Sequence, residues 1–352
     1  MNEHLHTPVV PFSISVPCSA AQLLNRMSGT SFQARNLGQA AEIWMGMLKD
    51  ETTIFFGLAG AMVPAGMRPV IVYLIENRLI DVLVSTGANL FHDLYETIGK
   101  RHWQGSAMAD DLELAQANIN RIYDVYAPEP DVIYADEYIT RFSLSLDHSR
   151  AYTTREYFYL LGKELTALAV EPGIITAAAA AGVPIYCPAF GDSVFGMSVG
   201  AARVKSGQKL LFDIVQDVLE MTQIFIAAPV TGVIYVAGGT PKNFIQQATI
   251  ASYIYGQKNP GHRHAIQITA DTPQWGGLSG CTFQEAQSWK KLSFQAHMVT
   301  INADATIALP LLVSAVAERH QHYHPRLNRP TFSLEGEMGI DPGKGGAIPK
   351  DR

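Results

Sequence analysis

The sequence has little charge and no long apolar run. Charged residues make up 16% of its 352 residues, whereas globular domains usually carry about 25%. The shortfall indicates extra buried surface, either in a well-buried core or at the interfaces of an oligomer. Gly, Pro or charged residues break every apolar stretch before about 18 residues, so we expect no membrane-spanning segment.

The sequence also lacks the patterns of secreted, metal-binding and nucleic-acid-binding proteins. Its three cysteines, Cys18, Cys187 and Cys281, are widely spaced and match neither a zinc site nor a disulfide framework. The start, MNEHLHTPVV, lacks the positive charge and apolar run of a signal peptide. No Lys/Arg cluster accompanies the net charge of −6. We therefore expect a cytoplasmic protein with no metal and no nucleic-acid partner.

The sequence does contain a regular alternation of short apolar runs and helical patterns. The apolar runs are rich in β-branched and aromatic residues, and small residues follow most of them. This order predicts a doubly wound, mostly parallel Rossmann-like sheet with helices on both faces. We predict strands at 52–58, 80–85, 184–187, 232–236, 265–269 and 299–302. We predict helices at 37–49, 67–77, 154–168, 174–181, 210–223, 242–255 and 307–320, and a further helix that begins at His92 and Asp93.

Three segments fall outside this alternation. Residues 1–36 are predicted to form an N-terminal extension before the main domain, 37–320. Residues 321–352 form a polar tail rich in Pro and Gly, which we expect to be disordered or draped over the surface. Residues 101–150 combine a helical patch, a turn at 118–121 and a Pro-containing corner. We interpret them as an inserted helical segment over one face of the sheet.

Turns of small residues follow several of the predicted strands. Thr86 and Gly87 follow one strand, Asp192 lies in the turn after another, and Gly238 follows a third. Such a turn at the start of a helix is a common site for an anion or a cofactor. The sequence has no strict G-x-G-x-x-G motif, so this pattern alone leaves the cofactor open.

The stretch 275–291, WGGLSGCTFQEAQSWKK, combines a glycine loop, a short helix and a lysine. Thr282 and Glu285 have the spacing of a capping box. Trp289 lies one turn beyond Glu285, and an acid beside an aromatic face suits an alkylammonium ligand. The alternatives are a purely structural cap and a tryptophan packed in the core. Lys291 closes the helix, where the dipole raises a lysine pKa, so a role as nucleophile requires burial or nearby cations.

Several motifs in order resemble the deoxyhypusine synthase family, which includes related homospermidine synthases. The similarity covers about residues 38–318, and the helix-loop stretch 279–291 is among its most specific parts. The other matching segments are IDVLVSTGANLFHDL at 80–94, NINRI at 118–122, LGKEL at 161–165, PAFGDSVFG at 188–196, AGG at 237–239 and ADATIALPLLV at 303–313.

The resemblance implies an NAD-dependent transfer of the aminobutyl group of spermidine, or of a related polyamine, to an acceptor amine. In the family a lysine that matches Lys291 carries the group as an imine. The acceptor is a lysine of a translation factor precursor in deoxyhypusine synthases and putrescine in homospermidine synthases. The alternatives are an NAD-dependent amine dehydrogenase and a non-catalytic polyamine binder. The resemblance also implies a homotetramer with active sites at the subunit interfaces.

The matching positions assign expected roles to individual residues. Lys291 is expected to be the nucleophile. The positions expected to bind the amine substrate are Glu285, Trp289, Asn243 and Gln247. The positions expected to bind NAD are Thr86, Gly87, His92, Asp192, Gly238, Thr269, Asp304 and Ala305.

Several of these positions depart from the family pattern. The acids that hold spermidine fall at Met197 and near Leu278, and the acid beside the cofactor sugar is His92. Asp271 is a possible substitute acid. The usual Trp-Gly-Lys is Trp-Lys-Lys here, and the extra Lys290 would either repel a polyamine or lower the pKa of Lys291. The resemblance therefore implies NAD more directly than it implies spermidine.

Overall fold

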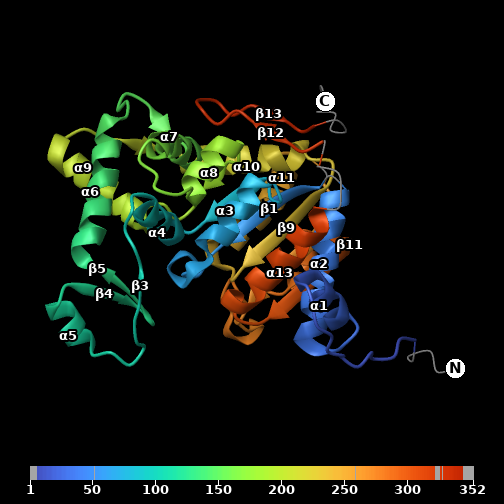
Figure 1. Cartoon of the computed structure of the whole chain (residues 1–352). Helices are drawn as coiled ribbons and strands as arrows, with labels where there is room; N and C mark the ends of the chain where they lie inside the picture. The colour runs from blue at the N-terminus through green and yellow to red at the C-terminus, as the bar shows by residue number, and fades with distance from the viewer. Residues whose placement is uncertain (1–5, 51, 258, 322–325, 327, 344–352) are drawn as a thin grey trace.

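The computed structural model of the chain describes residues 6–50, 52–257, 259–321, 326 and 328–343. Six parallel strands form its central sheet in the spatial order β11-β10-β9-β1-β2-β7 (Figure 1). From the other edge this order is third, second, first, fourth, fifth and sixth along the chain, as in a doubly wound Rossmann-like fold. The predicted fold class is therefore confirmed. The strands are β1 (Thr53–Leu58), β2 (Val82–Ser85), β7 (Ile185–Tyr186), β9 (Thr231–Val236), β10 (His262–Thr269) and β11 (Leu292–Asn302).

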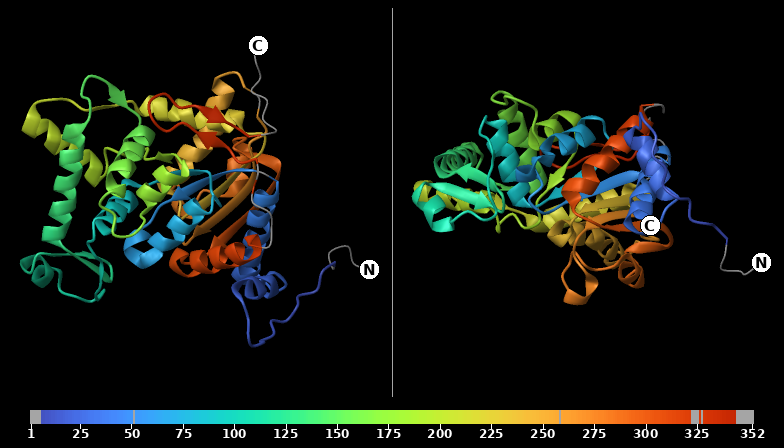
Figure 2. Two further views of the ribbon diagram at one scale, coloured as in Figure 1. Left: turned by 45° about the horizontal axis from the view of Figure 1, so that its top comes forward. Right: turned by 60° about the horizontal axis from the view of Figure 1, so that its bottom comes forward.

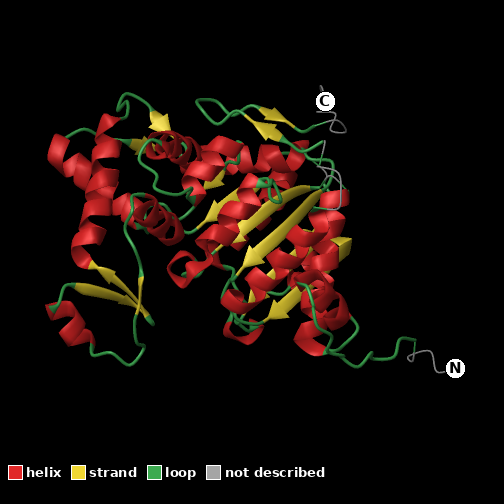
Figure 3. Ribbon diagram, in the orientation of Figure 1, coloured by secondary structure: helices red, strands yellow, loops and turns green. Residues whose placement is uncertain are grey.

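The central strand β1 is buried along its whole length. It pairs with β2 on one side and with β9 on the other. Ile54, Phe56 and Leu58 belong to one apolar cluster and Phe55 to a second, because successive side chains point to opposite faces of a sheet. Helices cover both faces (Figure 3), which explains why the strand reads as a continuous apolar run.

The helices agree with the predictions in most places. Helix α9 was not predicted, and α4 begins at Gly87 and not at His92. Helix α10 starts later than expected because Asp213 caps it by accepting a hydrogen bond from the Gln216 amide. No helix within the described ranges is long and apolar enough to cross a bilayer. The main-domain helices are α2 (Phe32–Lys49), the π-helix η1 (Val63–Met67), α3 (Arg68–Glu76), α4 (Gly87–Thr97), α7 (Thr154–Thr166), α8 (Ile174–Ala181), α9 (Val194–Ser206), α10 (Ile214–Ala227), α11 (Gly239–Ile254) and α13 (Ala305–His320).

The N-terminal extension contains a helix, α1 (Ala20–Ser28), that packs against α2 and α13. Ser19 starts it with a capping box, and the Ser19 hydroxyl donates a 2.7 Å hydrogen bond to Glu318. Because α2 begins at Phe32, the predicted boundary between residues 36 and 37 lies inside this helix. The division into domains itself stays a prediction.

The inserted segment 101–150 is more mixed than predicted. It holds a three-stranded antiparallel sheet in the order β3-β5-β4 as well as two helices, and it lies to one side of the parallel sheet (Figure 2). The predicted turn at 118–121 is wrong, because only Asn118 has a turn conformation, with φ of 56°. The elements are β3 (Trp103–Gln104), α5 (Asp111–Gln116), β4 (Ile119–Ile122), β5 (Val125–Pro128) and α6 (Glu129–Ser145).

The described part of the polar tail forms an antiparallel pair, β12 (Thr331–Phe332) and β13 (Ile340–Asp341). The buried guanidinium of Arg155 donates to the carbonyl oxygens of Leu334 and Gly336, at 2.6 and 2.9 Å, and pairs with Glu220. This part of the tail is therefore held on α7 and α10. Residues 322–325, 327 and 344–352 lie outside the described residues.

Candidate functional site

The loop and short helix of the stretch 275–291 form as predicted. Helix α12 (Phe283–Ser288) begins with a complete capping box. The Glu285 amide donates to the Thr282 hydroxyl at 3.1 Å, and the Glu285 carboxylate accepts from the Thr282 amide at 2.6 Å. The hydrogen bond from the Thr282 amide lowers the pKa of Glu285. Glu285 is therefore both a cap and an exposed, ionised carboxylate.

The end of α12 presents Lys291. The Lys291 amide donates to the Ala286 carbonyl oxygen and the Lys290 amide to that of Gln287, each at 2.9 Å, the two bonds of a Schellman motif. Lys290 has the left-handed conformation that this motif requires, with φ of 58°. Its ammonium lies 5.2 Å from the ring centroid of Tyr253. We expected the charge of Lys290 either to repel a polyamine or to lower the pKa of Lys291. In the structure this charge lies against Tyr253 of α11.

Lys291 is half-buried beside Trp289. Its Nζ atom lies 5.8 Å from the Trp289 ring, and Trp289 is 67% exposed, so the core-packing alternative for this tryptophan is wrong. Burial lowers the pKa of Lys291, and the nearby Cys281 opposes this effect. The direction expected from the helix end alone is therefore reversed by burial.

Two buried side chains that the sequence analysis did not identify hold the loop in place. The Lys242 ammonium donates to the Gln267 side-chain oxygen at 2.9 Å and to the Cys281 carbonyl oxygen at 2.5 Å. The Gln267 amide group donates to the carbonyl oxygens of Ala237 and Ser279, each at 2.8 Å. Burial is the main cause that lowers the pKa of Lys242 to about 8; the charge of Lys291 acts in the same direction, and Cys281 and Glu285 oppose it. No local sequence pattern marks this contact, because it joins α11, β10 and the loop.

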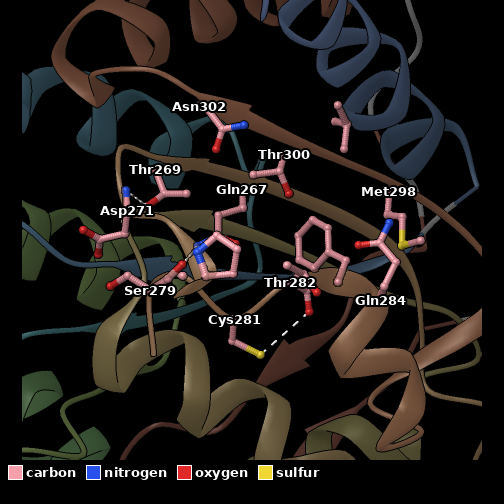
Figure 4. Close-up of a pocket in the computed structure, with 14 residues that line it drawn as sticks. Gln267, Thr269, Asp271, Ser279, Cys281, Thr282, Gln284, Met298, Thr300 and Asn302 are labelled. Carbon is pink, nitrogen blue, oxygen red and sulfur yellow. Dashed lines mark hydrogen bonds between the residues drawn. The ribbon is translucent and has the colours of Figure 1, made fainter. Parts of the chain in front are cut away.

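A cavity of about 330 Å3 opens between this loop and the ends of β10 and β11 (Figure 4). Thr269, predicted to bind the cofactor, lines it together with Asp271 and Cys281. The Thr269 hydroxyl accepts from the Asp271 amide at 3.0 Å. Asn243 and Gln247 lie one turn apart on α11, half-buried and exposed respectively, and neither side chain bonds another described residue.

A second group of predicted residues gathers at the ends of β2 and β7. A Cβ on Gly87 would lie 2.3 Å from Ser193 Cβ, so this glycine lets α4 approach the loop that carries Asp192. His92 and Asp192 line a cavity of about 620 Å3 together with Met197. This cavity has no lining residue in common with the one beside Thr269, and α4 and α9 lie apart from β11 (Figure 1). Within a single copy of the chain, these residues therefore do not lie beside Lys291.

The remaining predicted cofactor positions lie at the edge where the strands end. Asp304 lines a third cavity, of about 740 Å3, between η1, α13 and the inserted segment. Its carboxylate caps α13 by accepting from the Thr306 amide at 2.7 Å, and Ala305 is the first residue of that helix. At Gly238 a Cβ would lie 2.5 Å from Ser279 Cα, so Gly238 packs against the loop. Among the described residues, no group of three or more His, Cys, Asp or Glu could hold a metal ion.

Known proteins share this sequence over most of its length. The family model for deoxyhypusine synthase matches residues 22–316. A protein of Methanosarcina mazei named "Probable deoxyhypusine synthase 2" is 46% identical over 342 residues, which cover 97% of this chain and 98% of the relative. A protein of the same name from Archaeoglobus fulgidus is 46% identical over 303 residues, 86% of this chain and 99% of the relative.

A solved structure shares the fold. The crystal structure of a candidate deoxyhypusine synthase from Entamoeba histolytica has a TM-score of 0.57 and 21% identity. The match covers 84% of this chain and 91% of that one. The resemblance seen in the sequence motifs is confirmed by the family match and the relatives. The chain belongs to the deoxyhypusine synthase family.

Proposed function

We propose that this chain is a cytoplasmic, NAD-dependent aminobutyl transferase. It moves the 4-aminobutyl group of spermidine, or of a related polyamine, through an imine on Lys291 to an acceptor amine. The observation that carries the proposal is the environment of Lys291: its ammonium is half-buried, its pKa is lowered, and it lies 5.8 Å from the ring of Trp289. A lysine nucleophile must be uncharged, and burial favours the uncharged form.

Trp289 and Glu285 are proposed to bind the substrate, and Lys291 is proposed to react with it. The exposed face of Trp289 attracts an alkylammonium group by cation–π interaction, and the ionised carboxylate of Glu285 attracts the same charge. The neutral amine of Lys291 then attacks the carbon of the oxidised C=N bond. A C–N bond to Lys291 forms, the bond to diaminopropane breaks, and the acceptor amine later displaces Lys291 in the same way.

Bound NAD supplies the removal and return of a hydride, which no side chain can perform. We propose that the cofactor positions named above hold it. Asp304 and Asp192 support this, because both are exposed carboxylates on open cavities, of about 740 and 620 Å3, where they can accept hydrogen bonds from ribose hydroxyls. Ile122 lines both cavities, so they adjoin. Gly238 contacts Ser279 in this chain, and its cofactor contact stays a prediction.

We also propose that a second copy of the chain completes the site within a homotetramer. The two groups of predicted residues lie at separate cavities of one chain, as described above. Large apolar side chains of β11 and α11 are exposed, with Phe294 at 81% and Ile254 at 75%. Exposed apolar surface of this kind is typical of an interface. Sedimentation of the full chain as a monomer would contradict this part of the proposal.

The covalent step can be tested by trapping. The full chain is mixed with NAD and spermidine, reduced with borohydride, and the peptide that contains Lys291 is examined by mass spectrometry. We expect an aminobutyl adduct on Lys291, none in Lys291→Ala, and an unchanged adduct in Lys290→Ala, whose lost side chain lies against Tyr253. No adduct, with an adduct in a known deoxyhypusine synthase treated in parallel, would exclude the covalent mechanism.

The same mixtures identify the acceptor. A precursor protein with an acceptor lysine and putrescine are supplied side by side, and the products are separated. Transfer to putrescine alone would indicate a homospermidine synthase-type activity. Steady NADH formation without a transfer product would indicate an amine dehydrogenase, and binding without turnover a polyamine binder.

A further inference from the structure

Three side chains of α4 and the loop that follows it form a continuous hydrogen-bonded chain. Nδ1 of His102 lies 2.7 Å from a carboxylate oxygen of Glu96, and Nε2 of His102 lies 2.9 Å from Nδ1 of His92. A carboxylate can only accept, so Nδ1 of His102 carries a proton and its Nε2 accepts one from His92. In the neutral rings, Nε2 of His92 is therefore left with a free lone pair.

That lone pair lies at the His92 end of the three hydrogen-bonded side chains, next to a cavity. His92 lines the cavity of about 620 Å3, and His102 lines the neighbouring cavity of about 740 Å3. Nε2 of His92 has no hydrogen-bond partner among the described residues, and it lies on the side of the ring away from Nδ1. Burial and the neighbouring His102 lower the pKa of His92 to about 4, so the ring is uncharged at neutral pH.

Neighbouring side chains hold Glu96, His102 and His92 in place and determine which ligands the cavity can bind. The Tyr95 ring lies 4.9 Å from that of His102. Phe91, Ile122 and Met197 give the cavity an apolar wall, and Asp192 contributes a carboxylate. An amine with an aliphatic body matches this lining. Other charged groups near these side chains are Arg68, which pairs with Asp93 and lies 3.7 Å from Glu96, and the ion pair Lys100–Asp131. Asp124 and Asp304 line the cavity that His102 lines.

We propose that His92 accepts a proton from an amine bound in this cavity, and that His102 and Glu96 are positioning residues that relay it. The proposal rests on the proposed function, because an ammonium nitrogen must lose its proton before the adjacent carbon can give up a hydride. It adds a proton path that ends in neither Lys291 nor the cofactor, and it requires that Lys291 of a second copy reach this cavity, as in the proposed homotetramer.

The relay balances without a charged ring. The N–H bond of the ammonium breaks and Nε2 of His92 gains that proton. The Nδ1 proton of His92 passes to Nε2 of His102, and the Nδ1 proton of His102 passes to Glu96. Both rings exchange tautomers, and two opposite charges disappear, that of the ammonium and that of the Glu96 carboxylate. This path avoids forming an imidazolium ion at a site that disfavours one.

The first test needs no turnover. In 15N NMR spectra of the full chain without ligands, we expect His92 with Nδ1 protonated and Nε2 unprotonated, with signals assigned from His92→Gln and His102→Gln. Addition of NAD and spermidine should shift the Nε2 signal of His92. A protonated Nε2 in the free chain, or no shift with ligands, would overturn the proposal whether or not Lys291 forms an adduct.

The second test measures hydride transfer as the appearance of NADH in a single turnover. We expect His92→Gln to be about 100-fold slower at pH 7, with KM for spermidine changed less than kcat. Its rate should recover about tenfold per pH unit as solution hydroxide replaces the missing base. His102→Gln should show the same alkaline recovery, and His320→Gln, at the far end of α13, should match the unchanged chain. A His92→Gln profile parallel to that of the unchanged chain would overturn the relay, while a trapped Lys291 adduct would leave the proposed function standing.

Discussion

The ammonium of Lys242 lies 2.5 Å from the carbonyl oxygen of Cys281 and joins the first turn of α11 to the loop before α12. Lys242 is 2% exposed, so this contact is an internal charged hydrogen bond. It connects the stability of the loop to a titrating group whose pKa is lowered to about 8. Lys242 thus lies beneath the loop that leads to Lys291.

Lys242 predicts how stability depends on pH. Between pH 8 and the ordinary lysine pKa of about 10.4, the unfolded chain holds a proton on this residue that the folded chain has lost. The contribution of Lys242 to the free energy of unfolding should therefore rise across this window, by up to about 3 kcal/mol. In Lys242→Met this rise should be absent. Urea unfolding at pH 7.5, 9 and 10 measures it, and parallel curves for the two proteins would contradict the assignment.

The backbone conformation of Lys290 predicts that glycine is more stable than alanine at this position, the reverse of their usual order in a helix. Its φ of 58° is costly for any residue with a Cβ, by about 1–2 kcal/mol. Lys290→Gly and Lys290→Ala both lose the contact with Tyr253, so the comparison isolates the backbone. We expect the glycine variant to be more stable by about 1 kcal/mol, in urea unfolding at constant pH. An alanine variant of equal or greater stability would show that the left-handed conformation is not maintained.

Glu285 and Thr282 allow capping to be separated from binding. A glutamine at position 285 can still complete a capping box but carries no charge. Glu285→Gln should therefore raise KM for spermidine about tenfold and leave stability nearly unchanged. Thr282→Ala should lower stability by about 1 kcal/mol with a smaller change in KM. If Glu285→Gln changes only stability, the carboxylate is a cap alone.

Trp289 predicts a graded loss of amine binding. Its face is open to a ligand, and a cation–π contact contributes about 0.5–2 kcal/mol, which corresponds to roughly 2- to 30-fold in affinity. Trp289→Leu should weaken spermidine binding by a factor in this range, and Trp289→Phe should weaken it less. Calorimetry in the presence of NAD measures both. Equal affinities for all three proteins would place the amine away from this ring.

The elements of the fold could be predicted because their signals are local. The alternation of apolar strands and helices predicted all six strands of the parallel sheet, and the capping box at Thr282 and Glu285 formed as its spacing indicated. The misses also have local causes. Helix α9 has a weakly patterned face with glycines at 196 and 200, and the hairpin of β4 and β5 turns on Tyr123 and Asp124 without a glycine.

The sequence by itself determined the order of strands and helices, the capped helix before Lys291 and the family. These depend on residues within a few positions of one another or on motifs in order along the chain. The tertiary structure decided the direction of the shift in the Lys291 pKa, the hydrogen bonds of Lys242 and Gln267 to the loop, and the hydrogen bonds of His102 to His92 and Glu96. Burial is a property of the whole packed chain, and side-chain contacts between separate elements depend on where the folded chain puts them. No local pattern encodes either.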